Sequence, residues 1–286
     1  MIGHICADLL PNGTAVLGGT ALYSALTAAR LGWRVGVLTR GAYGQTIDGV
    51  EIPSLEAYAS ELNIIVQDAE SPTLFVNEYH AGRRTQQLPK WAGPIDLRGL
   101  PPHWRNAKII HLGPIAQEID PKQTGGLTPS FLGATPQGWM RDWPRATGGR
   151  VKLHHLRLPA DLAGRLDAIV VSDEEIGLAR DTVERVGDRR LGVITKGEDG
   201  ARVLFGGDHY DLPGFRTNPV DLTGAGDVFA AAFFIRATER ASSAITATRF
   251  ANAVAALSLR GIGPEGVPTL SEVEAFLKDA EERVLR

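Results

Sequence analysis

Short apolar runs alternate along this chain with longer segments whose apolar positions recur at helical spacing. The apolar runs predict buried strands over Met1–Ala7, Arg34–Thr39, Ala107–Leu112, Asp167–Val171, Leu191–Thr195 and Ala201–Phe205. The helical spacing predicts helices over Thr20–Leu31, from directly after the Thr223–Gly226 turn to Ile235, over Ala241–Leu259 and over Ser271–Leu285. Ser271 and Glu274 are spaced as a capping box for the last of these helices. A strand, the glycine pair Gly18-Gly19, a helix and a second strand make a βαβ opening, which is typical of an α/β fold.

Two alternating segments interrupt this succession of strands and helices. Thr73–Tyr79 and Arg83–Leu88 flank Ala81-Gly82, and the pattern predicts a β-hairpin. We expect the hairpin to stand off the main sheet; an ordinary edge hairpin is the alternative interpretation.

Composition limits the classes of function. The 286 residues are 43% hydrophobic and 22% charged with a formal net charge of −3, so the chain has no general attraction for nucleic acid or for an anionic membrane. The single cysteine, Cys6, excludes an internal disulfide and suits a reducing compartment. The seven histidines show no metal-ligand spacing, and no signal peptide or membrane span is evident. These features predict a cytoplasmic protein in which any phosphate-binding site is formed by a small local group of residues.

The most informative stretch is Asn218–Phe229, in which Asp221 and Asp227 flank the turn Thr223-Gly224-Ala225-Gly226. Small residues allow a ligand to approach the backbone, and the start of the following helix supplies N–H groups and a positive dipole end for an anion. Asp227 stands where it can take a proton from an attacking hydroxyl, and Asp221 can help to hold a metal ion or a water. These are the groups that phosphoryl transfer requires. The alternative is an ordinary capped helix after a glycine turn.

The run Asp-x-Thr-Gly-Ala-Gly-Asp before an Ala/Phe-rich helix resembles the signature of the ribokinase-like, or phosphofructokinase-B, carbohydrate kinases. The resemblance implies one three-layer α/β/α domain over residues 1–286, with a mostly parallel central sheet and a small β-strand lid near residues 10–18 and 73–90. It implies transfer of the γ-phosphate of ATP to a hydroxyl of a sugar or polyol, with Mg²⁺ bridging the phosphates. A lid would exclude water during transfer.

The resemblance also assigns roles to individual residues. It makes Asp227 the catalytic base and Gly224, Ala225 and Gly226 the anion hole, with Asp221 and Glu175 supporting the metal. It places the nucleotide near Thr195, Gly197, Gly200, Thr223 and Asn252. It places the acceptor near Asp8, Gly18, Gly19, Tyr23 and Arg141.

The chain departs from the family pattern at two positions where the family has asparagine: Tyr23 and Ser172 stand there instead. Tyr23 could stack on a base, which keeps a nucleoside kinase open as an alternative, and a catalytically silent ligand-binding relative is a second alternative. The run Gln137–Arg141 loosely resembles inositol-kinase-like members, and a solvated Arg141 is the plainer interpretation. A monovalent cation and a homodimer are also left open.

Overall fold

The central sheet carries strands from both ends of the chain. The structure is a computed structural model that describes residues 1–80 and 83–284. The sheet consists of β6 (Leu62–Asp68), β3 (Val35–Gly41), β9 (Ile109–Leu112), β10 (Phe131–Ala134), β14 (Ala168–Ser172), β15 (Leu191–Thr195), β16 (Ala201–Phe205) and β17 (Asp208–Leu212). All pairs from β6 to β15 are parallel, and β16 and β17 add an antiparallel edge. Among the described residues, β3 and β9 are joined through the bridges that Ile2 makes to Leu38 and Leu112.

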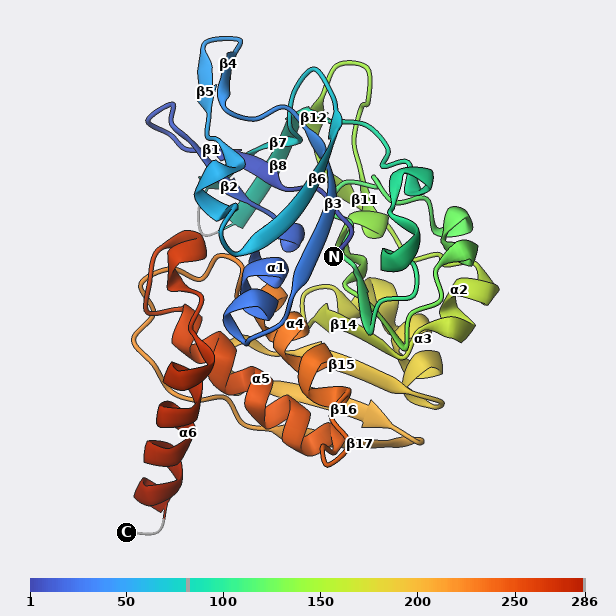
Figure 1. The fold of residues 1–286 in the computed structure, drawn as a ribbon, viewed down its shortest axis with the longest axis vertical. Coiled ribbons are helices and arrows are strands. Elements are labelled where there is room, and N and C mark those ends of the chain that lie inside the picture. The colour runs from blue at the N-terminus through green and yellow to red at the C-terminus, as the bar shows by residue number, and fades with distance from the viewer. Residues whose placement is uncertain (81–82, 285–286) are drawn as a thin grey trace.

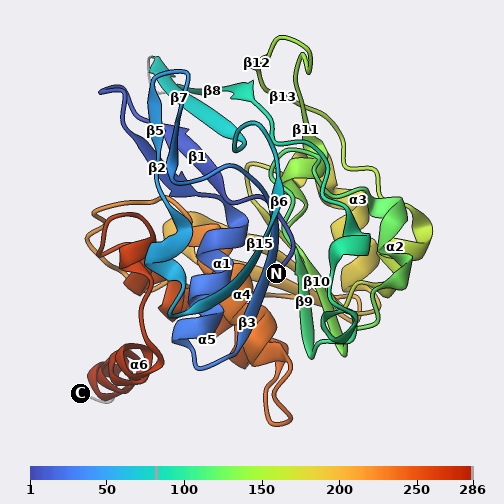
Figure 2. The same ribbon diagram turned by 45° about the horizontal axis from the view of Figure 1, so that its top comes forward.

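Helices cover both faces of this sheet (Figures 1 and 2). One side carries α1 (Thr20–Arg30), α4 (Ala225–Ala237) and α5 (Ala244–Ser258), and the other carries α2 (Ala160–Arg165) and α3 (Ile176–Gly187). The last helix, α6 (Leu270–Val284), packs on α5. Short 3-10 segments lie between these elements: Leu55–Tyr58, Leu97–Gly99, Pro102–Trp104, Pro121–Gly126, Pro136–Met140, Gly197–Asp199 and Gly263–Gly266. The three-layer α/β/α architecture expected from the sequence is confirmed.

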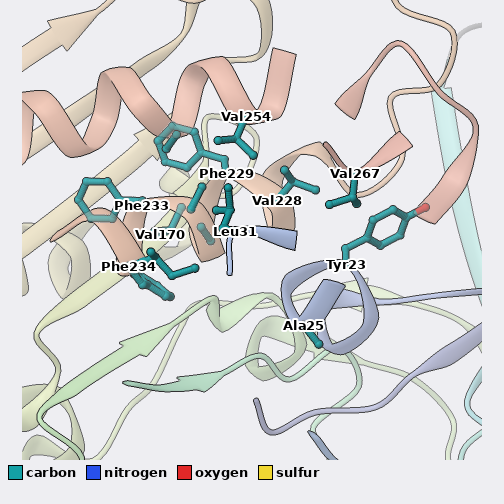
Figure 3. Packing of buried hydrophobic residues seen from close by; sticks show 14 of the residues in the cluster. Tyr23, Ala25, Leu31, Val170, Val228, Phe229, Phe233, Phe234, Val254 and Val267 are labelled. Carbon is teal, nitrogen blue, oxygen red and sulfur yellow. The ribbon is translucent and has the colours of Figure 1, made fainter. Parts of the chain in front are cut away.

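The alternation of side chains along the strands divides the core into two parts. In β14, Val170 points into the cluster formed with α1, α4 and α5, whereas its neighbours Ile169 and Val171 point into the cluster formed with α3. Figure 3 shows the first cluster, in which Phe229, Phe233 and Phe234 of α4 pack beside Val170 and Val254. Because α4 lies between the sheet and its neighbouring helices, all its side chains from Val228 to Ile235 are buried.

A second, smaller sheet lies to one side of this body and is labelled near the top of Figure 1. Its order is β12 (Gly149–Arg150), β8 (Arg83–Lys90), β7 (Leu74–His80), β1 (Cys6–Leu9) and β2 (Ala15–Gly18). The predicted hairpin therefore exists and stands off the central sheet, although its turn residues Ala81 and Gly82 lie outside the described part of the chain. Two further ladders pair β4 (Gln45–Ile47) with β5 (Val50–Ile52) and β11 (Arg141–Asp142) with β13 (Lys152–Leu153).

Two sequence predictions were wrong in detail. Met1–Ala7 is not one strand, because Ile2 bridges the central sheet and the chain then crosses to β1 in the small sheet. The final helix begins at Leu270, and its capping pair is Thr269 with Glu272, not Ser271 with Glu274: the Thr269 N–H donates to the Glu272 carboxylate at 2.7 Å. Both pairs have the required spacing, so the sequence alone could not separate them. In the described part of the chain, no helix is long and apolar enough to cross a membrane.

Candidate active site

A cavity of about 1040 Å³ lies between the small sheet and the carboxyl ends of β14 and β15. Ser172 and Thr195 line it at the ends of those two strands, Asp8 and Asn77 line it from the small sheet, and the start of α4 lines it from a third direction. Ligands of open α/β sheets bind at the carboxyl ends of the strands. The position of this cavity therefore makes it the candidate site.

The turn that leads into α4 exposes its backbone N–H groups. Gly224 precedes the helix with φ 79°, a left-handed conformation that favours glycine, and a Cβ added there would meet the ring of Tyr23 at 2.4 Å. Among the described residues, the N–H groups of Gly226 and Asp227 have no backbone acceptor, and that of Ala225 makes only a long 3.5 Å contact with the Leu222 carbonyl. The first turn of α4 is thus able to bind an anion in the cavity.

Asp227 lies in that first turn and lines the same cavity. Burial raises the pKa of its carboxyl to about 6; the negative charge of Glu175 adds to this, whereas a hydrogen bond from Thr20 and the charge of Arg141 oppose it. The Ser24 hydroxyl donates to the Asp227 backbone carbonyl at 3.1 Å and so fixes this turn against α1. The result is a carboxylate that is ionised at neutral pH but basic enough to accept a proton.

Asp221 holds the loop in place through both carboxylate oxygens. Oδ1 accepts from the N–H of Thr223 at 2.9 Å, and Oδ2 accepts from the N–H of Gly263 at 2.9 Å. Burial alone would raise the pKa of Asp221, but the hydrogen bonds from Thr223 and Gly263 outweigh it and lower the pKa. Asp221 therefore ties the signature loop to the segment before α6.

Glu175 links the end of β14 to the loop that carries Gln137. Its Oε1 accepts from the Gln137 side-chain amide at 2.8 Å, and its Oε2 accepts from the Ser172 N–H at 3.0 Å. In the described residues no three His, Cys, Asp or Glu side chains group to hold a metal. Glu175 and Asp221 both line the cavity, and two separate carboxylates suit a Mg²⁺ ion bound through its waters better than a closed protein cage.

The opposite end of the cavity presents a row of polar side chains from the small sheet. The Asn77 amide donates to Asp8 Oδ1 at 3.1 Å, and the Gln86 amide donates to Asn77 Oδ1 at 3.1 Å. A carboxylate with amides beside it can accept from and donate to neighbouring hydroxyl groups of one ligand. This end of the cavity is suited to a polyhydroxylated molecule.

Arg141 lies within the cavity wall and is not solvated, since only 8% of its surface is exposed. Its Nη1 donates to the Ile115 carbonyl at 2.9 Å, and its guanidinium lies 5.3 Å from the ring centroid of Phe75. Tyr23 is also buried, with 3% exposure, and its ring packs against Gly224. Tyr23 thus supports the loop that precedes α4, and its buried ring is not available to stack on a nucleoside base.

The structure brings most, but not all, of the predicted site residues to this cavity. Asp8, Gly19, Tyr23, Arg141, Glu175, Thr195, Asp221, Thr223, Gly224, Ala225, Gly226 and Asp227 line it. Gly18 lies behind Asp8, where an added Cβ would meet Asp8 Oδ2 at 2.9 Å. Gly197, Gly200 and Asn252 do not line it. The Asn252 amide instead donates to the Leu212 and Pro213 carbonyls at 3.3 and 3.0 Å.

Thr20, Asn77 and Gln86 line the cavity but were not singled out from the sequence. Asn77 and Gln86 occupy polar positions of the predicted hairpin. The alternating pattern there predicted strands, but nothing in it indicated that these two side chains face a ligand site. Thr20 follows the glycine pair directly, and only the packing of α1 against α4 brings it to Asp227.

Comparison with known proteins gives a family model and several relatives. Residues 162–270 match the model described as pfkB family carbohydrate kinase. The ribokinase of Bacillus subtilis (strain 168) is 44% identical over 85 residues, which are 29% of this chain and 29% of that protein. The chain therefore aligns with less than a third of that relative's length.

Solved structures resemble the chain over almost its whole length. A pyrophosphate-dependent kinase of the ribokinase family, complexed with a pyrophosphate analogue and myo-inositol, has a TM-score of 0.74 at 21% identity, covering 96% of this chain and 98% of its own. The Arabidopsis thaliana ribokinase, complexed with ribose and ATP, has a TM-score of 0.68 at 18% identity and covers 97% of both chains. At these identities the likeness shows the fold.

Proposed function

We propose that the chain transfers a phosphoryl group to a hydroxyl of a sugar or polyol, because residues 162–270 match the pfkB carbohydrate kinase model and the fold is that of ribokinase-family structures. One observation carries the proposal. The Asp227 carboxylate opens into the same cavity as the N–H groups at the start of α4, and the polar row of Asp8, Asn77 and Gln86 faces that cavity from the small sheet.

The proposed reaction divides between two ends of the cavity. An acceptor hydroxyl loses its proton to Asp227 while its oxygen bonds to the terminal phosphorus of the donor. The bond from that phosphorus to the bridging oxygen breaks, and the electron pair leaves with the shortened donor. The N–H groups of Ala225, Gly226 and Asp227 stabilise the negative charge of the transferred group. Glu175 and Asp221 would hold Mg²⁺ through water, and the ion would neutralise charge on the donor phosphates.

We propose ATP as the donor, since the ribokinase fold includes the Arabidopsis enzyme complexed with ATP. Pyrophosphate is a second candidate, favoured by a specific observation. Gly197, Gly200 and Asn252, expected on the nucleotide side, do not line the cavity, and Asn252 is engaged with backbone carbonyls. The structural neighbour complexed with a pyrophosphate analogue shows that the fold accepts such a donor.

For the acceptor, the polar row of Asp8, Asn77 and Gln86 supports a cyclic polyol or a sugar, and myo-inositol is the specific acceptor we propose to test first. A nucleoside loses its main support, because Tyr23 is packed under Gly224 and cannot stack on a base. We also propose that β7 and β8 close over the acceptor as a lid and exclude water from the transfer. The same small sheet is where a homodimer would form.

A donor-by-acceptor assay tests these assignments. ATP and pyrophosphate are each combined with myo-inositol, ribose, fructose, adenosine and cytidine, and product phosphate esters are measured. We expect turnover with a sugar or polyol that disappears in Asp227→Asn and persists in the control Asp173→Asn, whose exposed side chain does not line the cavity. Turnover with neither donor, together with thermal stabilisation by an acceptor, would instead identify a catalytically silent binding protein.

A further inference from the structure

Glu118 is a buried carboxylate next to the candidate active site. Its side chain is completely buried and does not line the cavity. Oε1 accepts from the His4 N–H at 2.9 Å and from the Ile115 N–H at 3.0 Å. Oε2 accepts from the Ile115 N–H at 3.0 Å and from the Ala116 N–H at 2.7 Å. A carboxylate loses its hydration when it is buried, so it persists in a core where hydrogen bonds of this kind replace the water. These bonds fix the backbone of the three residues that make them.

The hydrogen bonds of Glu118 connect two segments that border the cavity. His4 lies where the chain passes from the central sheet to β1, and β1 carries Asp8. Ile115 belongs to the loop of residues 114–118, which follows β9, and it lines the cavity. One buried side chain thus holds this loop against the segment that leads to the acceptor end of the cavity.

The loop of residues 114–118 holds Arg141 in two places. The Ile115 carbonyl accepts from Arg141 Nη1 at 2.9 Å, while the N–H of the same isoleucine is bound by Glu118. The Gln117 side-chain amide donates to the backbone carbonyl of Arg141. The orientation of the guanidinium and the position of its backbone therefore both depend on the geometry of the loop.

Gln117 has an uncommon backbone conformation for a residue other than glycine, with φ 53°. Its side-chain oxygen accepts from the guanidinium of Arg145. This guanidinium lies 4.5 Å from the ring centroid of Trp91 and 4.7 Å from that of Trp143. A left-handed residue of this kind persists where its surroundings fix it, and such residues cluster at functional sites. Contacts on several sides therefore hold the loop in one conformation.

The same loop positions the segment that carries Gln137. The Pro114 carbonyl accepts from the Gly138 N–H at 2.8 Å, and a Cβ added at Gly138 would lie 2.4 Å from the Ile115 nitrogen. The two backbones are thus in direct contact, which glycine allows because it has no Cβ. Gln137 lines the cavity and donates to Glu175 at 2.8 Å. A shift of the loop would therefore change this part of the cavity wall as well.

Arg141 faces the acceptor end of the cavity. Its guanidinium lies 5.3 Å from the ring centroid of Phe75. Phe75 belongs to β7, the strand that also carries Asn77, and both residues line the cavity. A guanidinium has five N–H donors in a fixed plane, so its orientation determines which oxygens of a ligand it can bind. The group that fixes this orientation can therefore influence which acceptor binds.

We propose that Glu118 is a positioning residue for the phosphate acceptor. Its carboxylate fixes the loop of residues 114–118, and the loop fixes the orientation of Arg141 toward the hydroxyl groups of the bound sugar or polyol. The inference rests on the proposed kinase function, which assigns the acceptor to this end of the cavity. Glutamine cannot take the place of Glu118, because an amide has one acceptor oxygen and its NH₂ group would face a buried N–H group.

The variants Glu118→Gln and Val186→Ala test the role in acceptor binding. Val186 is a buried core residue near the end of α3 that does not line the cavity, so its truncation should lower stability and leave the acceptor site unchanged. Both variants should lower Tm by several degrees. In Glu118→Gln alone the acceptor KM should rise about tenfold, while kcat stays within about threefold and the donor KM within about twofold. A lower Tm with an unchanged acceptor KM in Glu118→Gln would overturn the proposal.

A double-mutant cycle with Arg141→Met determines whether Glu118 acts through Arg141. If it does, adding Glu118→Gln to Arg141→Met should raise the acceptor KM by no more than about twofold, because the side chain that Glu118 positions is already gone. The decrease in Tm caused by Glu118→Gln should persist in both backgrounds. A rise of about tenfold in the acceptor KM in both backgrounds would contradict the proposal.

Chemical modification gives a readout that does not require turnover. Phenylglyoxal reacts with accessible arginine side chains, and peptide mass spectrometry gives the rate at each arginine. Arg141 should react at least about fivefold faster in Glu118→Gln than in the parent or in Val186→Ala. The exposed Arg189 should react equally in all three proteins. Faster modification of Arg141 without turnover of any acceptor would reject the kinase function and keep the role of Glu118 in holding Arg141. An unchanged rate at Arg141 would overturn that role.

Discussion

The two ends of the proposed active-site cavity are built in different ways. The donor end is almost contiguous in sequence: Asp221 to Asp227 supplies the loop, the N–H groups and the carboxylate, and the start of α4 orients them. The acceptor end is assembled from β1, β7, β8 and the loop before β11, with Asp8 and Asn77 separated by 69 residues. A local motif retains its geometry when the rest of the chain diverges, whereas an assembled wall changes with every element that contributes to it.

This contrast matches what the chain shares with other proteins. The family model covers residues 162–270, which include the whole donor loop and none of the small sheet. The departures from the family pattern at Tyr23 and Ser172 lie outside the loop itself. Substitutions at the donor end should therefore affect transfer with any acceptor, and those at the acceptor end should affect the choice of acceptor.

The largest expected effect is at the base. Asp227→Asn keeps the shape of the side chain but cannot take up the proton, so kcat should fall about 10²–10⁴-fold. Donor binding, measured by calorimetry, should change little. Asp173→Asn serves as the control, and near-normal turnover in Asp227→Asn would refute the assignment.

Gly224→Ala should damage the loop through its backbone. The new Cβ would lie 2.4 Å from the Tyr23 ring at a residue with φ 79°, so we expect a loss of roughly 2–4 kcal/mol in unfolding free energy and at least tenfold in kcat. Gly177→Ala is the matched control, because Gly177 lies in the first turn of α3, where a Cβ meets nothing within 4 Å and alanine is a better helix former than glycine. Chemical denaturation of both variants distinguishes them, since the control should gain stability.

Because its pKa is raised in the folded protein, ionised Asp227 should lower the free energy of unfolding at neutral pH. Its folded-state pKa of about 6 lies above the ordinary value of 3.8. The protonated carboxyl therefore contributes its whole stabilisation below pH 3.8, and this contribution is lost as the pH rises through 6. Asp227→Asn should therefore be more stable than the parent by up to about 3 kcal/mol at pH 7, and the gain should shrink toward pH 4.

Unfolding curves at pH 4, 5, 6 and 7 measure this difference. Activity gives a second readout of the same group, because kcat/KM should fall about tenfold per pH unit below pH 6 when the base is protonated. A stability difference that does not vary with pH would show that the carboxyl titrates normally.

The smallest effect is expected at the acceptor end. Asp8→Asn replaces an acceptor-only carboxylate next to Asn77 and should raise the acceptor KM about tenfold or more, while the donor KM stays within about twofold. Asp68→Asn, an exposed residue of β6, is the control. If Asp8→Asn changed both constants equally, the division of the cavity into two ends would be wrong.

The sequence predicted which segments form strands and helices better than it predicted where these elements lie in the fold. Strands β15 and β16 were found at their observed boundaries, because short apolar runs between glycine turns leave few alternatives. Helix α4 begins at Ala225, inside the turn that was expected to precede it. The first strand was misjudged, since its apolar pattern gave no indication that the chain passes from one sheet to another after Ile2. Asn77 and Gln86 could not be identified either, because their role arises only where the hairpin meets β1.

What the sequence determined by itself was the donor loop. A glycine with positive φ, a helix start and an acid in the first turn are consequences of about ten consecutive residues, and their chemistry follows from local backbone geometry. The tertiary structure alone decided that Tyr23 packs against Gly224 of this loop, that Arg141 is buried, and that Ile2 bridges β3 and β9 in the central sheet. Each of these depends on contacts between distant segments, and such contacts are set by how whole elements pack.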